Sequence, residues 1–109
     1  MVIIMEMESK KNDRLDHKLM WELLPFDLIE KVVEVYTAGA EKYGANTWQG
    51  LPNGYQRYKA ALLRHLCCYE KGESHDPETG CHHLAQVVWN GLAMLYFALR
   101  HNEYNSANK

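Results

Sequence analysis

Apolar side chains recur at the spacing of an α-helix in three segments of the chain, and stretches rich in glycine, proline and asparagine separate these segments. The first segment carries one continuous stripe, at Leu28, Ile29, Val32, Val33 and Tyr36. Strand-like alternation is limited to a possible short strand over residues 2–5. The pattern predicts an all-α fold, a compact bundle of three main helices. An N-terminal arm over residues 6–15 precedes it, and a frayed tail over residues 102–109 follows.

Turn and capping residues give the expected limits of the three helices, which are residues 25–44, 55–71 and 81–101. Pro25 suits a first helical turn, and Gly72 stands where a C-terminal cap belongs. Asp76 is expected to cap the N-terminus of the third helix. The loop over residues 46–54 holds Trp48 and joins the first two helices.

The third helix carries apolar residues around most of its circumference: Leu84, Val87, Val88, Leu92, Leu95, Tyr96 and Leu99. It is therefore expected to be the most buried of the three. A three-helix domain leaves apolar surface on such a helix that a monomer does not cover, so a homo-oligomer is expected.

Length and charge limit the functions open to the chain. Its 109 residues suffice for one domain, 1–109. A net charge of −2 gives no basic field for duplex nucleic acid or an anionic membrane surface. No signal peptide or run of transmembrane length is found, which predicts a cytoplasmic protein. The odd set of three cysteines predicts free thiols.

Acidic residues form two groups with helical spacing, one on the first helix and one after the second: Asp27, Glu30, Glu34, Glu70, Glu73 and Asp76. Carboxylates three or four residues apart can converge on a hard divalent cation that also holds phosphates. The spacing is permissive, so a solvated helix surface is the alternative for the first group, and a capping role is the alternative for Asp76. Glu73 and Asp76 are the favoured Mg²⁺ ligands, with Glu30 and Glu34 as candidate partners.

Two other metal sites are disfavoured. Residue types that bind zinc lie close together in the sequence, at Cys67, Cys68, Cys81, His82 and His83. Neighbours along a helix point about 100° apart, so both members of an adjacent pair cannot reach one ion. His75 and Asp76, with His65 upstream, are too short a match to the His-Asp pair of metal phosphohydrolases.

Basic and aromatic residues are interleaved along the chain: Lys18 with Trp21, Lys42 with Tyr43 and Trp48, and then Arg64. Cations beside stacking rings predict a nucleotide pocket. Four rings at helical spacing are assigned to the core: Tyr36, Tyr58, Trp89 and Tyr96. Trp21 and Trp48 lie off the helical stripes and are the better ligand candidates.

Short motifs follow one another over residues 11–99: Gly39-Ala40-Glu41-Lys42-Tyr43-Gly44, Asn46-Thr47-Trp48, Arg64-His65-Leu66, Gly72-Glu73, Asp76-Pro77-Glu78-Thr79-Gly80, His83-Leu84-Ala85 and Asn90. With these motifs the chain resembles the phage dATP/dGTP diphosphohydrolase N-terminal domain family. The resemblance implies an all-α domain similar to MazG-like pyrophosphohydrolases. Those enzymes cleave the bond between the α and β phosphates of a nucleoside triphosphate with the help of Mg²⁺ or Mn²⁺.

The metal-binding pairs of those enzymes are matched in part. They have a helical ExxE pair and a later ExxD pair, and the second is matched by Glu73 and Asp76. The first pair is not matched in strict form, since the first helix offers Asp27, Glu30 and Glu34. An incomplete set of carboxylates leaves binding without hydrolysis open.

The leading hypothesis is a metal-dependent pyrophosphohydrolase acting on purine (deoxy)nucleoside triphosphates. Glu73 and Asp76 would hold the metal, and His65 or His83 would orient the attacking water. Residues expected to bind the substrate are Lys18, Trp21, Lys42, Tyr43, Asn46, Trp48, Arg64, His83 and Asn90.

Two further hypotheses stay open. One is a non-catalytic protein that sequesters a nucleotide or cyclic-nucleotide signal and so blunts a host defence. The other is a small helical interaction module. The two nucleotide hypotheses place the protein in the cytoplasm of an infected bacterium.

Overall fold

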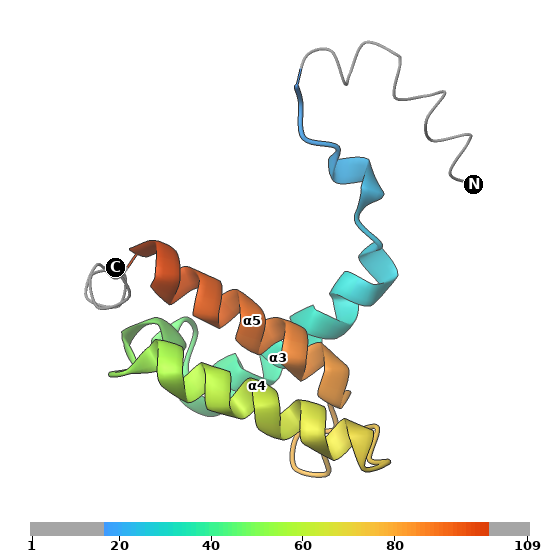
Figure 1. The fold of residues 1–109 in the computed structure, drawn as a ribbon, viewed down its shortest axis with the longest axis vertical. Coiled ribbons are helices and arrows are strands. Elements are labelled where there is room, and N and C mark those ends of the chain that lie inside the picture. The colour runs from blue at the N-terminus through green and yellow to red at the C-terminus, as the bar shows by residue number, and fades with distance from the viewer. Residues whose placement is uncertain (1–16, 101–109) are drawn as a thin grey trace.

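The structure, a computed structural model, describes residues 17–100 (Figure 1). In chain order its elements are η1 (Trp21–Leu23), α3 (Phe26–Tyr43), η2 (Thr47–Gly50), α4 (Gly54–Glu70) and α5 (His83–Arg100). No strand occurs among residues 17–100, where His75 and His82 form an isolated bridge. The predicted all-α fold with three main helices is therefore confirmed. The possible strand at residues 2–5, the arm at 6–15 and the tail at 102–109 lie outside the described residues.

Glycine ends two of the helices as the sequence predicts. Gly44 follows α3 with a φ of 97°, and its N–H donates to the Ala40 carbonyl over 2.8 Å. Gly72 follows α4 with a φ of 105°, and its N–H donates to the Tyr69 carbonyl over 2.9 Å. Both backbones lie in the region where a side chain is unfavourable, so glycine is the residue that stops each helix at low cost.

The helices α4 and α5 run antiparallel and side by side, and α3 crosses behind them (Figure 1). The connection between α4 and α5 is the loop over residues 71–82. The described part of the chain before α3 projects away from the helices (Figure 1). The helical part of the structure thus consists of the α4–α5 pair and of α3, whose C-terminal half packs against that pair.

The most buried helix is α5, as expected, but its buried face differs from the expected one. The buried residues of α5 are mostly small or polar: His83, Ala85, Gln86, Asn90, Ala93 and Phe97. Four residues of the expected apolar arc are exposed, at Val88, Leu92, Leu95 and Leu99. Small and polar residues let α4 approach closely and supply hydrogen bonds in the interior, whereas the large apolar residues face outward in the single chain.

The apolar stripe of the first helix is also less buried than its periodicity predicts. Val32 is the buried residue of α3, while Leu28 and Val33 are 61% and 50% exposed. The start of α3 extends beyond the α4–α5 pair (Figure 1). Hydrophobic periodicity therefore identified the helix, but it did not show how much of the apolar stripe other helices bury.

A cluster of aromatic rings fixes η2 against the longer helices. The Trp48 ring lies 5.5 Å from that of Trp89 and 5.0 Å from that of Tyr96, both in edge-on arrangements. The Tyr58 hydroxyl donates to the Trp48 carbonyl over 3.1 Å. Tyr36 joins the cluster at 5.7 Å from Trp89. Edge-to-face packing of this kind holds the loop between α3 and α4 in one position.

Within residues 17–100, none of the helices combines the length and the apolar character that a membrane span requires.

Candidate functional site

A cavity of about 1180 Å³ opens between the C-terminal half of α3, η2, α4 and the start of α5. It gathers side chains that are far apart in the sequence: Lys42, Tyr43, Asn46, Trp48, Arg64, His65, Gln86 and Asn90. Its volume exceeds the roughly 300–1,000 Å³ usual for a small-molecule site, and its lining mixes aromatic rings with a few cations and amides. All but Gln86 belong to the residues that the sequence singles out.

The last turn of α3 presents the first cation of the cavity, Lys42, and a turn with two positive φ values follows it. Gly44 and Asn46 both have positive φ values, 97° and 62°, and the Thr47 hydroxyl donates to the Gly44 carbonyl over 3.1 Å. Lys42 Nζ lies 5.1 Å from the centre of the Tyr43 ring. A hydrogen bond with Tyr43 and the nearby Glu78 carboxylate raise the pKa of Lys42. Lys42 is therefore a fixed positive charge at neutral pH.

A hydrogen-bonded chain of three side chains crosses from α4 to α5 and the loop. His65 Nδ1 lies 2.9 Å from His83 Nδ1, and His83 Nε2 lies 2.7 Å from Glu73 Oε1. An ionised carboxylate only accepts, so His83 donates from Nε2 to Glu73 and accepts at Nδ1 from His65. The proton of His65 then sits on Nδ1, which leaves the lone pair of its Nε2 available.

His65 is uncharged at neutral pH. Burial and then the neighbouring His83 and Arg64 lower its pKa, against the opposing effect of Asp76. His83 is 2% exposed and lies behind His65 rather than on the cavity wall. The pair thus supplies one neutral imidazole to the cavity and a buried second imidazole that orients it.

Asp76 organises the loop instead of capping α5. Its Oδ1 accepts from the Glu78 N–H over 2.9 Å and its Oδ2 from the Gln86 amide over 3.3 Å. The predicted N-cap is wrong, because α5 begins at His83. Proline at position 77 and Gly80, with a φ of 77°, close a turn in which the Gly80 N–H donates to the Asp76 carbonyl over 2.7 Å. Asp76 therefore ties the loop to the buried face of α5.

The surroundings of Asp76 keep it ionised. Partial burial acts to raise the pKa of Asp76, but the hydrogen bonds from Glu78 and Gln86 and the nearby imidazoles outweigh it and lower the pKa. Its negative charge faces the His65 and His83 rings. This charge is present throughout the neutral range.

Glu30 and Glu34 occupy a different position from the other carboxylates. They line an adjoining hollow of about 420 Å³, which shares Glu41 and Thr79 with the cavity. Glu34 also accepts from Lys31 over 3.4 Å on the exposed face of α3. The structure brings this pair to the outer side of the loop and not into a group with Glu73.

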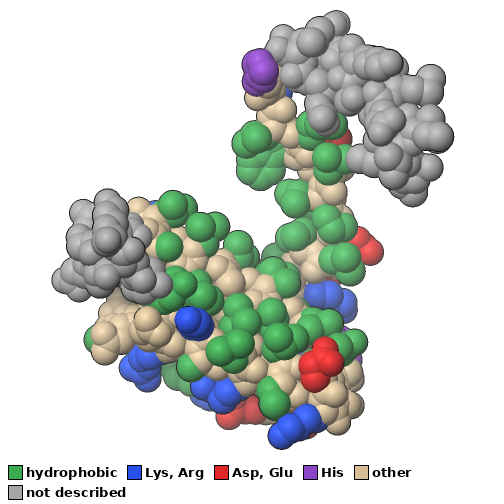
Figure 2. Space-filling model, viewed as in Figure 1, with side chains coloured by type: hydrophobic (Ala, Val, Ile, Leu, Met, Phe, Trp, Pro, Cys, Tyr) green, Lys and Arg blue, Asp and Glu red, His purple; other side chains and the backbone are tan. Residues whose placement is uncertain are grey.

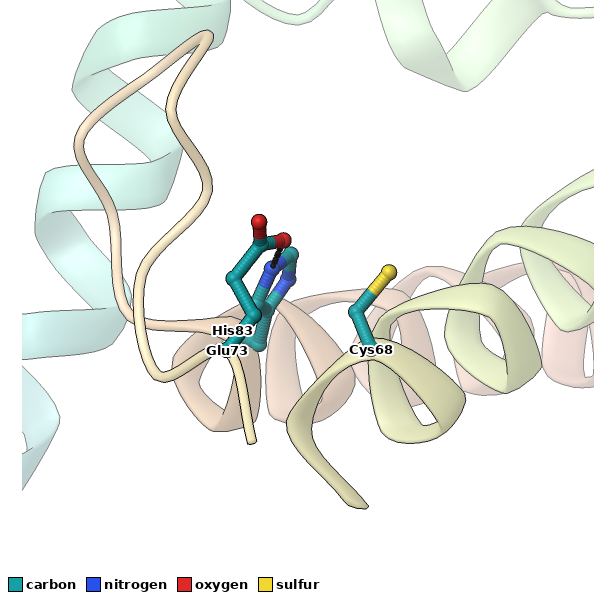
Figure 3. Close-up of side chains that lie close together, drawn as sticks. All are labelled: Cys68, Glu73 and His83. Atoms are coloured by element: carbon teal, nitrogen blue, oxygen red, sulfur yellow. Dashed lines mark hydrogen bonds and ion pairs between the residues drawn. The ribbon is translucent and has the colours of Figure 1, made fainter. Parts of the chain in front are cut away.

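Glu73 is the carboxylate that meets other metal-ligand types. A carboxylate oxygen of Glu73, Cys68 Sγ and a ring nitrogen of His83 lie within 4.8 Å of one another (Figure 3). Among residues 17–100 no further group of three such side chains converges as closely. Mg²⁺ often needs only one or two carboxylates beside substrate phosphates. Neither Glu73 nor Asp76 is among the residues that line the cavity, although Gln86, which hydrogen-bonds Asp76, is. A closed all-carboxylate cage is not formed by the described residues.

Lys18 and Trp21 are not among the residues that line the cavity, so the structure does not bring these two predicted ligands to it. Both are exposed on the segment that projects away from the helices, and the Trp21 side chain is 67% exposed (Figure 1). Trp48 lines the cavity, but its ring also packs inside the aromatic cluster.

The sequence analysis missed Gln86 as a site residue, and it named Cys68 only within the disfavoured zinc site. Gln86 is buried, and it links Asp76 to the cavity wall. A signal for it exists, since His83, Gln86 and Asn90 recur at helical spacing as a polar stripe on an otherwise apolar helix. The signal for Cys68 was the group of zinc-ligand types in the sequence, but periodicity did not show that its partners Glu73 and His83 come from other elements.

Comparison with known proteins identifies a family and one curated relative. A family model described as dATP/dGTP diphosphohydrolase, N-terminal, matches residues 8–107. A dATP/dGTP diphosphohydrolase of Salmonella phage PMBT28 is 40% identical over 70 residues, which are 64% of this chain and 23% of that protein. The chain therefore spans about a quarter of the length of this curated relative. No solved structure matches the chain.

Proposed function

Because the chain belongs to the dATP/dGTP diphosphohydrolase N-terminal family, we propose that it binds a purine (deoxy)nucleoside triphosphate and hydrolyses it to the monophosphate and pyrophosphate. The observation that carries the proposal is the cavity in which Lys42 and Arg64 lie with an uncharged His65. Cations, aromatic rings and a neutral base in one cavity are what recognition and hydrolysis of a triphosphate require.

Each wall of the cavity has a separate task in binding. Lys42 and Arg64 neutralise the phosphates. The forked guanidinium of Arg64 suits two oxygens of one phosphate. The Tyr43 ring is 67% exposed and is free to stack on the base. Asn46 and Asn90 supply amide groups that distinguish the edges of a purine.

The chemical step is attack of water on the α-phosphorus. The new bond joins the water oxygen to phosphorus, the bond to the bridging oxygen breaks, and pyrophosphate leaves with the electron pair. His65 Nε2 takes the proton of the water, while His83 and Glu73 hold the imidazole in the required tautomer. Lys42 and Arg64 stabilise the charge on the leaving pyrophosphate.

The metal dependence expected from the resemblance is part of the proposal. Glu73 and Asp76 would hold Mg²⁺ or Mn²⁺ next to the phosphates. When bound, the ion would neutralise phosphate charge and polarise the phosphoryl oxygens. Glu30 and Glu34 are the outer candidates on α3.

Pyrophosphate release from dATP and dGTP, measured with and without Mg²⁺, tests the proposal. We expect one monophosphate and one pyrophosphate per turnover, and a loss of about 10²-fold or more in His65→Gln. The matched control is His17→Gln, which changes an exposed histidine far from the cavity. Equal rates in the two variants would contradict the role of His65.

Sequestration is the second candidate function. It is favoured by the lining of the cavity, which includes none of the four carboxylates expected to hold the metal, Glu30, Glu34, Glu73 and Asp76. A nucleotide or a cyclic dinucleotide would then bind without being cleaved. Recovery of the intact ligand after saturation with Mg²⁺ would establish this function in place of hydrolysis.

A homo-oligomer in the cytoplasm of an infected bacterium completes the proposal. Val88, Leu92, Leu95 and Leu99 form an exposed apolar stripe on α5. Figure 2 shows apolar side chains over the visible face of the helices and along the projecting segment. Contiguous apolar surface of this extent is typical of a subunit interface.

A further inference from the structure

Cys68, Glu73 and His83 come together from three different elements of the fold. Cys68 lies in the last turn of α4, Glu73 in the loop, and His83 at the first residue of α5. Their ligand atoms, a sulfur, a carboxylate oxygen and an imidazole nitrogen, all lie within 4.8 Å of one another (Figure 3). The argument from helix geometry excluded a zinc site that uses both members of an adjacent pair. The fold brings together only one member of each pair, Cys68 of the cysteine pair and His83 of the histidine pair.

We propose that Cys68 Sγ, Glu73 and His83 Nε2 form a binding site for a borderline transition-metal ion such as Zn²⁺. Zn²⁺ takes sulfur, nitrogen and oxygen ligands with tetrahedral geometry, and three protein ligands leave the fourth position for water. Mg²⁺ and Ca²⁺ prefer oxygen ligands throughout, so a thiolate and an imidazole select against them.

The surroundings of His83 support this site independently of the three ligand types. The ring is 2% exposed, and its other nitrogen is already held by His65 over 2.9 Å. A second partner of this kind fixes the ring orientation of histidines that bind metals. A buried and doubly held imidazole loses little freedom when an ion binds.

The protons balance in a defined way on binding. The Cys68 thiol loses its proton to solvent, because the thiolate is the ligand. The His83 proton moves from Nε2 to Nδ1 and is donated to His65, whose own proton moves to Nε2. One proton is therefore released for each ion bound at neutral pH. The ion-bound chain also lacks the His65 Nε2 lone pair that the proposed hydrolysis uses.

Titration of the metal-free full chain with Co²⁺ tests the site, because Co²⁺ reports thiolate coordination by a charge-transfer band. We expect a 1:1 complex with this band and with release of one proton. Cys68→Ser should remove the band and Glu73→Gln should weaken binding by at least about tenfold. Cys67→Ser, which changes the exposed neighbouring cysteine, should leave both unchanged.

Three results would overturn the proposal. They are a band that survives in Cys68→Ser, a band that is lost in Cys67→Ser, and displacement of Co²⁺ by a large excess of Mg²⁺. His83→Gln changes a buried residue and can disturb folding. Glu73→Gln changes a side chain that is 48% exposed, so it tests the site in a chain that still folds. None of these readouts uses nucleotide turnover, so the metal site and the proposed hydrolysis fail separately.

Discussion

The ring of Phe97 on α5 covers Gly54, the first residue of α4, so closely that a Cβ at position 54 would collide with the ring. Both residues are buried. Since the two helices are antiparallel, this contact fixes their separation at one end. At the other end His65 of α4 reaches His83 of α5 over 2.9 Å. Packing at Gly54 thus contributes to the alignment of the site.

Gly54→Ala is expected to destabilise the protein by about 1–3 kcal/mol, because the added methyl group forces α4 and α5 apart. Gly39→Ala is the matched control. It lies inside α3 and its Cβ would meet no atom within 4 Å, so a gain of up to about 1 kcal/mol is expected there. Urea denaturation measures both. Similar free energies of unfolding for the two variants would refute the packing argument.

Substitution of the cavity cations should weaken nucleotide binding. Lys42→Ala and Arg64→Ala each remove a charged hydrogen-bond donor, and each is expected to lower the affinity for dGTP about tenfold. The dependence of affinity on salt should also become shallower. Lys31→Ala is the control, because Lys31 pairs with Glu34 on the outer face of α3. Calorimetric titration decides the matter, and an equal loss in Lys31→Ala would point to overall charge instead.

The Tyr58 hydroxyl gives the protein a measurable dependence on alkaline pH. Burial raises the pKa of Tyr58 above its ordinary value of 10.0. The folded state therefore holds this proton more tightly than the unfolded chain does. Its contribution to stability is complete below pH 10 and is lost as the pH rises through the folded pKa.

Tyr58→Phe provides the test of that dependence. At pH 8 the variant should be less stable by about 1 kcal/mol, because the hydrogen bond to the Trp48 carbonyl is lost. Thermal melts up to pH 11 should show the difference shrinking above pH 10, since the variant lacks the ionising group. Parallel curves over the whole range would show that Tyr58 ionises equally in both states.

Leu95→Glu should disrupt the proposed oligomer. Leu95 is 52% exposed at the middle of the apolar stripe on α5, and a charge there would be buried without a partner in an interface. Light scattering after size exclusion should show a lower mass than for the wild type. Gln56→Glu introduces the same residue on an exposed position of α4 and should not change the mass. A monomeric wild type would rule out the oligomer.

The sequence by itself determined which segments are helical and where two of them stop. Apolar periodicity over α3 and the glycines at positions 44 and 72 are local features, and they act through backbone geometry that needs no distant partner. The motifs around Lys42, Arg64 and His83 likewise identified the family before any contact was known.

Only the tertiary structure decided which faces of the helices are buried and which carboxylate meets which partner. Leu92 and Leu95 are residues of a type usual in a core, yet they are exposed in the single chain. The polar residues Gln86 and Asn90 are buried instead. Glu73 joins Cys68 and His83, and Glu30 faces another hollow. Burial and ligand grouping depend on how helices distant in sequence pack together, and one-dimensional periodicity does not contain that information.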